Sequence, residues 1–334
     1  MTKNDASGLP VIYSTHPLHP RAAAMLDGVA RLRIASRLDP AVFVAESRDA
    51  EALIIRVPVP PEIFEDAPRL RAAIRHGAGL DMVPMEAAAK AGVLVANVPG
   101  VNARTVAEYV FFAAMALLRR FRIINRDLRE KGWLEAREHT LHGNELAGKT
   151  IGIVGMGDIG RQVAAIATGG FGLKVLANTR RPEGVPPGIN IAFRALDDLM
   201  AEADIIAICC PLTPETRGMI DAARIRRMKP TAVIVNGARG AIIDDDALVA
   251  ALRENRIGGA ALDVFATQPL PRDHPYFGFD NVVLTPHMAG ITEESMERMG
   301  TGAAAEAIRV LSGELPHNLR NPEVVPAYRA RFPD

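Results

Sequence analysis

The sequence predicts an α/β fold in which one parallel-sheet domain is inserted into another. Short apolar strand-like segments alternate with helical ones from residue 11, and a second such series begins at residue 149. The final helical pattern is too short to start a third domain. A chain of 334 residues suffices for two domains. We therefore predict an outer domain of residues 1–103 and 292–334 and an inserted domain of residues 104–291.

The first series accounts for the N-terminal part of the outer domain. Helical composition marks residues 20–30 and 82–92, and strands are predicted at 11–14, 52–57, 71–77 and 93–98. Residues 105–133 contain neither Pro nor Gly before Gly132, which predicts one long helix or two consecutive ones. Apolar residues nearly all round its first half indicate burial between domains or subunits.

The second series forms the inserted domain. Its first strand lies in 149–160, and further strands are predicted at 173–179, 203–210, 231–237, 258–265 and 281–287. A last helix is predicted at 292–313. We expect this helix and the tail 314–322 to pack back against the first domain.

Composition narrows the class of partner. The 39 Lys and Arg balance the 39 Asp and Glu, so no strong field is available for nucleic acid or anionic membranes, and a small ligand is the better expectation. The two cysteines, Cys209 and Cys210, are adjacent within an apolar run. This position predicts buried thiols in a reducing compartment and argues against a disulfide or zinc site. The start lacks a signal peptide pattern and no apolar run reaches about 18 residues. We expect a cytoplasmic protein.

A glycine-rich turn follows the first strand of the inserted domain. Gly155, Gly157 and Gly160 form G-x-G-x-x-G, with Met156, Asp158 and Ile159 between them. The first glycine permits a tight turn, the second lets a pyrophosphate approach the backbone, and the third lets the helix pack on the strand. The N–H groups of the following helix point at the phosphates. The turn predicts a dinucleotide site in a Rossmann-type doubly wound sheet.

The residues at the end of the next strand indicate whether NAD or NADP is bound. NAD is held by a carboxylate there, but the segment reads Asn178, Thr179, Arg180, Arg181. Paired guanidinium groups suit a 2′-phosphate, which a carboxylate would repel. We therefore favour NADP over NAD. The alternative is that RRPEG (180–184) is merely a solvated turn.

Several further segments carry a family resemblance. They are HGAGLDMV (76–83), NVPGVNARTVAEYV (97–110), ELAGKTIGIVGMGDIG (145–160), CPLTPETRGMI (210–220), VNGARGAIIDDDAL (235–248), ALDVFATQPLP (261–271) and LTPHMAG (284–290). In these the chain resembles the D-isomer-specific 2-hydroxyacid dehydrogenases, such as glyoxylate/hydroxypyruvate reductase and phosphoglycerate dehydrogenase. The resemblance implies a Rossmann-type dinucleotide domain inserted into a smaller flavodoxin-like substrate-binding domain, with the active site in the cleft. Together with the apolar helix at 105–118 it suggests a homodimer.

The resemblance also implies roles for individual residues. Arg239 matches the arginine that grips the substrate carboxylate and polarises the keto oxygen, and His287 matches the acid that protonates that oxygen. Asp263 matches the residue that orients the nicotinamide carboxamide. The backbone of Ala78 and Gly79 matches a loop that binds the substrate carboxylate. The remaining expected cofactor contacts are Cys210, Pro211, Thr216, Ala238 and His287. Singly, such an arginine or histidine would be a surface or loop residue; their joint placement at strand ends favours a site.

Gln268 departs from the family pattern, which has glutamate beside the histidine. An amide can hold the ring but supplies no negative charge, so His287 should be easier to deprotonate. Three outcomes stay open, in order of preference. The enzyme reduces keto acids with a lowered pH optimum; it transfers hydride without a proton, as the related formate dehydrogenases do; or it binds nucleotide without turnover, as related co-repressors do.

The substrate itself is less constrained. Arg56 and His76 match the region where relatives contact the far end of the substrate, and either could meet a second anionic group. For Arg56, a surface or helix-facing charge is the preferred interpretation. The sequence thus predicts an NAD(P)-dependent oxidoreductase that interconverts a small 2-oxo acid and its D-2-hydroxy acid, with NADPH preferred.

Overall fold

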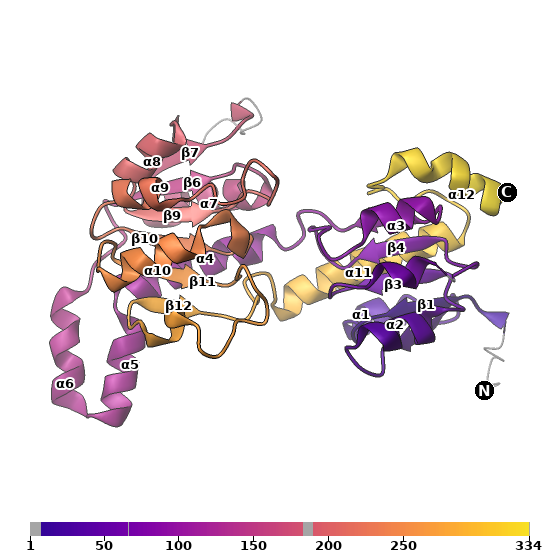
Figure 1. Ribbon diagram of the computed structural model, residues 1–334, viewed down its shortest axis with the longest axis horizontal. Helices are drawn as coiled ribbons and strands as arrows, with labels where there is room; N and C mark the ends of the chain where they lie inside the picture. The colour runs from indigo at the N-terminus through magenta and orange to yellow at the C-terminus, as the bar shows by residue number, and fades with distance from the viewer. Residues whose placement is uncertain (1–7, 66, 183–189, 334) are drawn as a thin grey trace. The chain divides into compact units, whose positions relative to one another are not determined.

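The computed structural model describes residues 8–65, 67–182 and 190–333 and shows two compact units (Figure 1). The smaller unit combines the chain up to Asn102 with the chain from Ile291, and the larger unit runs from Ala103 to Gly290. Residues 1–7, where we expect no signal peptide, and residues 183–184 of the RRPEG turn lie outside the described residues.

The smaller unit is built on a five-stranded parallel sheet. Its strand order, β2-β1-β3-β4-β5, is the flavodoxin-like order. The strands are β1 (Val11–Ser14), β2 (Arg31–Ile34), β3 (Ala52–Ile55), β4 (Ala72–Arg75) and β5 (Leu94–Asn97). Strand β2 was not predicted, because its sequence RLRI carries two arginines; it pairs only with β1 and so can keep polar side chains at the sheet edge.

Helices cover both faces of this sheet. Helix α11 (Glu293–Leu311) packs on one face with α1 (Pro20–Ala24) and α12 (Val325–Arg331), and its buried alanines let it approach the strands closely. A capping box between Thr292 and Ser295 fixes its start. The other face is covered by α2 (Pro40–Ser47), the 3₁₀ helix η2 (Pro61–Phe64) and α3 (Met85–Lys90). Helix α1 is shorter than predicted because turns replace it before Gly28.

The C-terminal tail completes the edge of the same sheet. Leu319 forms an antiparallel bridge with Ala96. The Arg320 N–H donates to the Val95 carbonyl at 2.8 Å. The buried side chain of Asn321 accepts from Val95 N at 2.8 Å and donates to the Val93 carbonyl at 2.9 Å. The tail therefore satisfies backbone groups that the last strand leaves open. A 3₁₀ turn, η7 (Pro322–Val324), follows it.

The larger unit contains a seven-stranded parallel sheet in the order β12-β11-β10-β9-β6-β7-β8. This is the Rossmann order, and it reverses between β6 and β9. The strands are β6 (Thr150–Val154), β7 (Lys174–Asn178), β8 (Ile191–Phe193), β9 (Ile205–Ile208), β10 (Val233–Asn236), β11 (Gly259–Leu262) and β12 (Val282–Leu284). The predicted fold class is confirmed, although the short edge strand β8 was missed.

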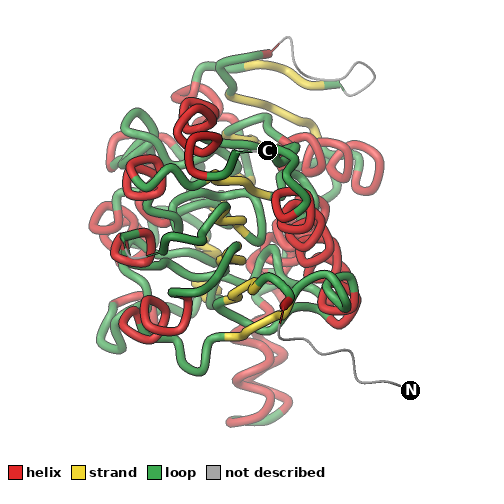
Figure 2. Tube along the Cα trace, turned by 90° about the vertical axis from the view of Figure 1, so that its right-hand side faces the viewer, coloured by secondary structure: helices red, strands yellow, loops and turns green. Residues whose placement is uncertain are grey.

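Helices again cover both faces, and Figure 2 shows the strands lying between helices. One face carries α4 (Ala103–Leu118) and α7 (Asp158–Phe171). The other carries α8 (Leu196–Glu202), α9 (Ala222–Arg227) and α10 (Asp245–Arg253). Two 3₁₀ turns, η5 (Gly240–Ile242) and η6 (Pro275–Gly278), follow β10 and precede β12.

The segment predicted as one or two helices is broken at Arg119 and Arg120. Helix α4 ends there, and Arg120 has a left-handed backbone (φ 53°) before α5 (Phe121–Glu130). Most of α4 is buried within its own unit, which accounts for its apolar character. Helix α5 forms a hairpin with α6 (Trp133–Glu138) and η3 (His139–His142), and Figure 1 shows it projecting from the larger unit.

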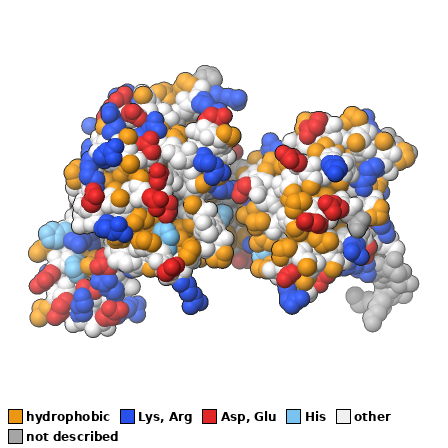
Figure 3. All heavy atoms as spheres, in the orientation of Figure 1, with side chains coloured by type: hydrophobic (Ala, Val, Ile, Leu, Met, Phe, Trp, Pro, Cys, Tyr) orange, Lys and Arg blue, Asp and Glu red, His pale blue; other side chains and the backbone are white. Residues whose placement is uncertain are grey.

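A buried carboxylate holds this hairpin together. Asp127 accepts hydrogen bonds from His139 at 2.9 Å, Arg126 at 2.8 Å and Lys131 at 3.0 Å. These donors hold the pKa of Asp127 well below its usual value. Elsewhere, charged side chains of both signs are interspersed over the visible surface (Figure 3). Across the described ranges, no helix has the length and apolar character required to span a membrane.

Candidate functional site

The glycine turn of the larger unit has the geometry of a phosphate cradle. Gly155 has φ 101°, and a Cβ there would lie 2.7 Å from the backbone nitrogen of Cys210. A Cβ on Gly160 would lie 2.1 Å from the Gly155 carbonyl oxygen, so the helix can pack on the strand only with glycine. A Cβ on Gly157 would meet nothing within 4 Å. The backbone at Gly157, just before the first turn of α7 with Asp158 and Ile159, therefore borders open space suited to a pyrophosphate.

Two arginines follow β7, close to this turn in the sheet because β7 pairs with β6. Arg180 and Arg181 are exposed, and within the described residues neither forms an ion pair. The Arg181 N–H donates to Thr179 Oγ1 at 3.3 Å. Burial raises the pKa of Cys210 to about 11, and the charge of Arg180 opposes that rise. The charge of Arg180 therefore acts on the loop that holds Cys210.

The loop after β9 holds three more of the expected cofactor contacts, Cys210, Pro211 and Thr216. Thr216 closes it by donating from Oγ1 to the Pro211 carbonyl at 2.7 Å. Met156, another member of the glycine turn, is buried in the core beneath α7. A phosphorylated dinucleotide is suited to these donors, which are the glycine turn, the N-terminus of α7 and the two arginines after β7.

Arg239 lies in a tightly ordered turn at the end of β10. The buried side chain of Asn236 donates to the Arg239 carbonyl at 2.9 Å and accepts from Ala238 N at 3.0 Å. A Cβ on Gly240 would lie 2.0 Å from the carbonyl carbon of Phe265. The arginine turn therefore packs directly on the backbone that leads to Gln268. Asn236 was not predicted as a site residue, although it is the polar last residue of a buried strand.

His287 lies in the neighbouring loop after β12 and pairs with Gln268. The Gln268 amide nitrogen is 3.4 Å from His287 Nδ1, while Gln268 Oε1 accepts from Phe265 N at 3.4 Å. In this orientation the amide donates to Nδ1, so a neutral His287 carries its proton on Nε2. The backbone of His287 is left-handed, with φ 57°.

The predicted trio is thus brought together by the sheet. Strands β10, β11 and β12 are parallel neighbours, so the turns that follow them share one edge. Gly237 and Ala289 also approach each other: a Cβ on Gly237 would lie 3.5 Å from the Ala289 Cβ. Asp263, at the end of β11, is fully buried, and both its oxygens accept hydrogen bonds from the loop around His287.

In the smaller unit, the loop at Ala78 and Gly79 has its carbonyl groups and its N–H groups in different states. Their carbonyls accept from Asn97 Nδ2 at 2.6 Å and from Arg75 Nε at 3.0 Å. Within the part of the chain that is described, their N–H groups donate to no protein acceptor. A loop with its carbonyls tied and its N–H groups open suits a carboxylate.

Arg56 and His76 differ in what they can offer. Arg56 is partly buried, and its guanidinium contacts only the Pro17 carbonyl at 3.3 Å and the Met296 sulfur at 3.6 Å; no described carboxylate neutralises it. His76 is buried, and burial together with Arg56 and Arg75 lowers its pKa to about 3. His76 is therefore neutral at ordinary pH and cannot supply a positive charge.

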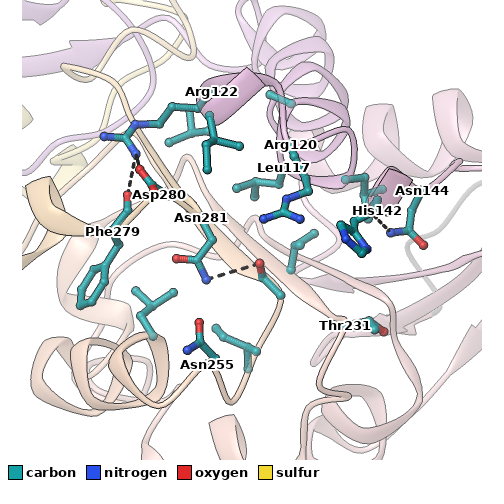
Figure 4. Close-up of a pocket in the computed structure, with 18 of the residues that line it drawn as sticks. Leu117, Arg120, Arg122, His142, Asn144, Thr231, Asn255, Phe279, Asp280 and Asn281 are labelled. Carbon is teal, nitrogen blue, oxygen red and sulfur yellow. Dashed lines mark hydrogen bonds and ion pairs between the residues drawn. The ribbon is translucent and has the colours of Figure 1, made fainter. Parts of the chain in front are cut away.

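A separate cavity of about 550 Å³ lies at the opposite edge of the larger sheet (Figure 4). Its walls include the C-terminal ends of α4 and α10, Arg120, His142 and Asn281. Strands β10 and β12 border it near their starts, at Val233 and Asn281. The cavity is therefore distinct from the Arg239–His287 region. Among the described residues, no group of His, Cys, Asp and Glu is arranged to hold a metal.

Comparison with known proteins identifies the family. Residues 111–289 match the family model for the D-isomer specific 2-hydroxyacid dehydrogenase, NAD binding domain. The chain belongs to the D-isomer specific 2-hydroxyacid dehydrogenase family. It is thus a nicotinamide-dependent enzyme, as the sequence predicted.

Individual relatives support this assignment over the whole chain. A glyoxylate reductase of Aeropyrum pernix is 36% identical over 333 residues, covering 97% of this chain and 99% of the relative. A D-3-phosphoglycerate dehydrogenase of Methanocaldococcus jannaschii is 36% identical over 94% of this chain but only 60% of that longer enzyme. The structure of a NADPH-dependent glyoxylate/hydroxypyruvate reductase of Sinorhizobium meliloti, in complex with NADP and malonate, matches with TM-score 0.81 and 27% identity over 93% of this chain and 96% of that one.

Proposed function

We propose that this enzyme reduces small 2-oxo acids, glyoxylate and hydroxypyruvate among them, to D-2-hydroxy acids with NADPH. The observation that carries the proposal is the convergence of the turns bearing Arg239, Gln268 and His287 at one sheet edge. Relatives named glyoxylate reductase and an NADPH-dependent glyoxylate/hydroxypyruvate reductase support the substrate and cofactor.

Arg239 binds and polarises the substrate in this proposal. A 2-oxo acid presents a carboxylate oxygen and a keto oxygen side by side, and the planar fork of a guanidinium matches that pair. Positive charge at the keto oxygen stabilises the charge that develops there as the carbon is reduced. The open N–H groups of Ala78 and Gly79 are proposed to bind the substrate carboxylate.

His287 supplies the proton. Protonated His287 donates from Nε2 to the keto oxygen, and the reverse reaction returns a proton to that atom. Gln268 can accompany both states, because its NH₂ group donates to a bare Nδ1 and its oxygen, after an amide flip, accepts from Nδ1–H. An uncharged partner stabilises imidazolium less than a carboxylate would, so reduction should fall off at lower pH than with glutamate.

The chain's own groups hold the cofactor. The first turn of α7 receives the pyrophosphate, and Thr179, Arg180 and Arg181 receive the 2′-phosphate. Bound reduced nicotinamide supplies the hydride. Asp263, Cys210, Pro211, Thr216 and Ala238 are the remaining proposed contacts.

Arg56 favours substrates with a second anionic group. It is a partly buried cation whose charge no described carboxylate neutralises, and burying an uncompensated charge is costly unless a ligand meets it. A carboxylate, phosphate or sulfonate at the far end of the substrate would do so. His76, which is neutral, can contribute only a hydrogen bond.

A second candidate reaction follows from the Gln268–His287 pair. The contact between the Gln268 amide and the His287 imidazole resembles the Gln–His pair of the related formate dehydrogenases. Such a pair would suit hydride transfer without proton transfer. Formate oxidation is therefore tested separately, by following NADPH formation from NADP⁺ and formate. We rank it second, because Arg239 and His287 together match reduction of a keto acid.

We also propose a homodimer in which the α5–α6 hairpin contacts the partner. Large apolar side chains are exposed on this hairpin and on the adjoining face of α4: Phe112, Met115, Phe121, Leu128, Trp133, Leu134 and Leu141. Trp133 is 67% exposed and Leu134 is 75% exposed. Large apolar side chains that are this exposed indicate an association surface. Both cysteines are free thiols, which accords with the proposed cytoplasmic location.

One assay tests the activity. NADPH consumption is followed with glyoxylate, hydroxypyruvate, phenylpyruvate and 3-sulfopyruvate, and nucleotide binding is measured in parallel. Turnover on one or more acids, strongest on 3-sulfopyruvate with its second anionic group, supports the proposal. Tight NADPH binding with no consumption on any acid would replace it with a nucleotide-sensing role.

A further inference from the structure

The carboxylate of Asp263 accepts hydrogen bonds from residues on both sides of His287 in the sequence. Asp263 Oδ1 accepts from Thr285 Oγ1 at 2.6 Å and from the Met288 N–H at 2.7 Å, and Oδ2 accepts from the Ala289 N–H at 2.8 Å. The backbone carbonyl of Asp263 accepts from the His287 N–H at 2.8 Å. One buried residue thus fixes four points of the loop that carries the imidazole.

This loop needs such support because of its backbone. His287 has φ 57°, in the left-handed region that a residue with a Cβ adopts at a cost of roughly 1–2 kcal/mol. Strain of this kind persists only where the surroundings determine the conformation. Removing the carboxylate would leave the Met288 and Ala289 N–H groups without acceptors, and the loop could relax.

Tyr109 extends the hydrogen bonds back to helix α4. Its hydroxyl lies 2.7 Å from Thr285 Oγ1. Because Thr285 gives its only proton to Asp263, Tyr109 must be the donor in this contact. Burial raises the pKa of Tyr109 to about 12, so its proton is retained at ordinary pH. The chain of donors runs from Tyr109 through Thr285 to Asp263.

The same helix also contacts the turn that leads to Arg239. A Cβ on Gly237 would lie 3.6 Å from Val106 and 3.9 Å from the Tyr109 ring. Helix α4 therefore packs against both turns that carry proposed catalytic side chains. Hydrogen bonds among buried groups reinforce one another, so this chain can hold the loop more firmly than its members would singly.

We propose that Tyr109, Thr285 and Asp263 form a largely buried hydrogen-bond relay that positions the His287 imidazole. This inference rests on the proposed function of His287. It gives Asp263 a positioning role in addition to the nicotinamide contact that the family resemblance implies. Tyr109 and Thr285 are positioning residues that touch neither substrate nor cofactor.

Variants at Thr285 and Tyr109 test the relay with little change in shape. Thr285→Val keeps the volume and removes the hydroxyl, Thr285→Ser keeps the hydroxyl, and Tyr109→Phe removes only the outer donor. We expect kcat with glyoxylate to fall on the order of tenfold in Thr285→Val and about fivefold in Tyr109→Phe. KM for NADPH and the midpoint of the pH profile should stay near wild type, and Thr285→Ser should restore most of kcat.

Two further measurements separate positioning from loss of fold. The His287 ring signal, assigned by its loss in His287→Asn, is followed by NMR in each variant, and thermal unfolding is recorded. We expect the ring signal to shift or broaden in Thr285→Val but not in Thr285→Ser. Tyr13→Phe is the matched control, because Tyr13 is also a buried tyrosine that donates to a carboxylate, Glu46 at 3.2 Å, but in the other unit; it should leave kcat and the His287 signal unchanged.

The outcomes distinguish the relay from the activity. Wild-type kcat and an unmoved His287 signal in Thr285→Val would overturn the relay, even if the enzyme reduces glyoxylate. A wild-type protein without turnover would overturn the proposed function, but the NMR comparison would still report whether the relay holds the ring. If Thr285→Val fails to fold, Tyr109→Phe decides by the same two readouts.

Discussion

Replacing Gln268 by glutamate tests how the acid–base histidine is tuned. The amide nitrogen of Gln268 is 3.4 Å from His287 Nδ1, and a glutamate in the same rotamer would place a charged oxygen there. Gln268 is exposed, so a water-like dielectric applies, and the attraction to imidazolium is about 1.2 kcal/mol. Since 1.36 kcal/mol is a tenfold change in proton affinity, Gln268→Glu should raise the high-pH limb of reduction by about one pH unit.

The direction of the pH shift follows from the protonation state of His287 that supports reduction. Reduction needs the protonated ring, and a neighbouring negative charge keeps that form to higher pH. The assay is kcat/KM for NADPH-dependent reduction between pH 5 and 10. Added salt should shrink the displacement, because the Debye length falls to about 3 Å at 1 M.

Gln268→Met is the matched control. Methionine has similar length but neither charge nor a strong hydrogen-bonding group, so it should lower kcat without raising the limb. A glutamate variant that is folded and active but has the wild-type limb would refute the reasoning. An equal displacement in Gln268→Met would refute it as well, because charge could not then be the cause.

Further predictions concern the cofactor, substrate, assembly and stability. Arg180→Ser combined with Arg181→Ser should raise KM for NADPH by roughly 10–100-fold and spare NADH, since each charge-assisted hydrogen bond contributes about 1.5–3 kcal/mol; equal use of both cofactors by the wild type would contradict the assignment. Arg239→Lys keeps the charge but loses the planar fork, so steady-state kcat/KM should fall on the order of 100-fold. Leu134→Asp should convert the dimer to monomers in light-scattering measurements, whereas a monomeric wild type would remove the proposed interface. Burial raises the pKa of Cys210 to about 11, so its contribution to stability is complete below the ordinary thiol value of 9.0 and is lost as pH rises to 11; urea midpoints at pH 8 and 10.5 should show the decline, and Cys210→Ala should lessen it.

The sequence was sufficient where the chemistry is local or is repeated along the chain. Gly155, Gly157 and Gly160 lie within six residues, and the structure gives each the space or contact that the motif predicts. The strand ends at Arg239, Gln268 and His287 could be placed on one edge because parallel strands share the direction of their C-terminal ends. Fold class and family followed from the same alternation and the same segments.

Other features depend on packing that no short segment contains. Tyr109 and Thr285 are separated by 176 residues, so their hydrogen bond is set by how α4 packs on the sheet. The break at Arg120 is not marked by a glycine or proline. Strand β2 carries two arginines, which it can keep because it lies at a sheet edge. The neutrality of His76 also arises only from its burial beside Arg56 and Arg75.

The tail beside β5 has a consequence for biosynthesis. Leu319, Arg320 and Asn321 supply contacts to the first-made strands, and α11 covers one face of their sheet. The smaller unit therefore cannot finish folding until the chain has been synthesised beyond Asn321, whereas the larger unit, which ends at Gly290, can fold earlier. During translation, strands β1 to β5 therefore have one apolar face uncovered while residues 103–290 of the larger unit are synthesised.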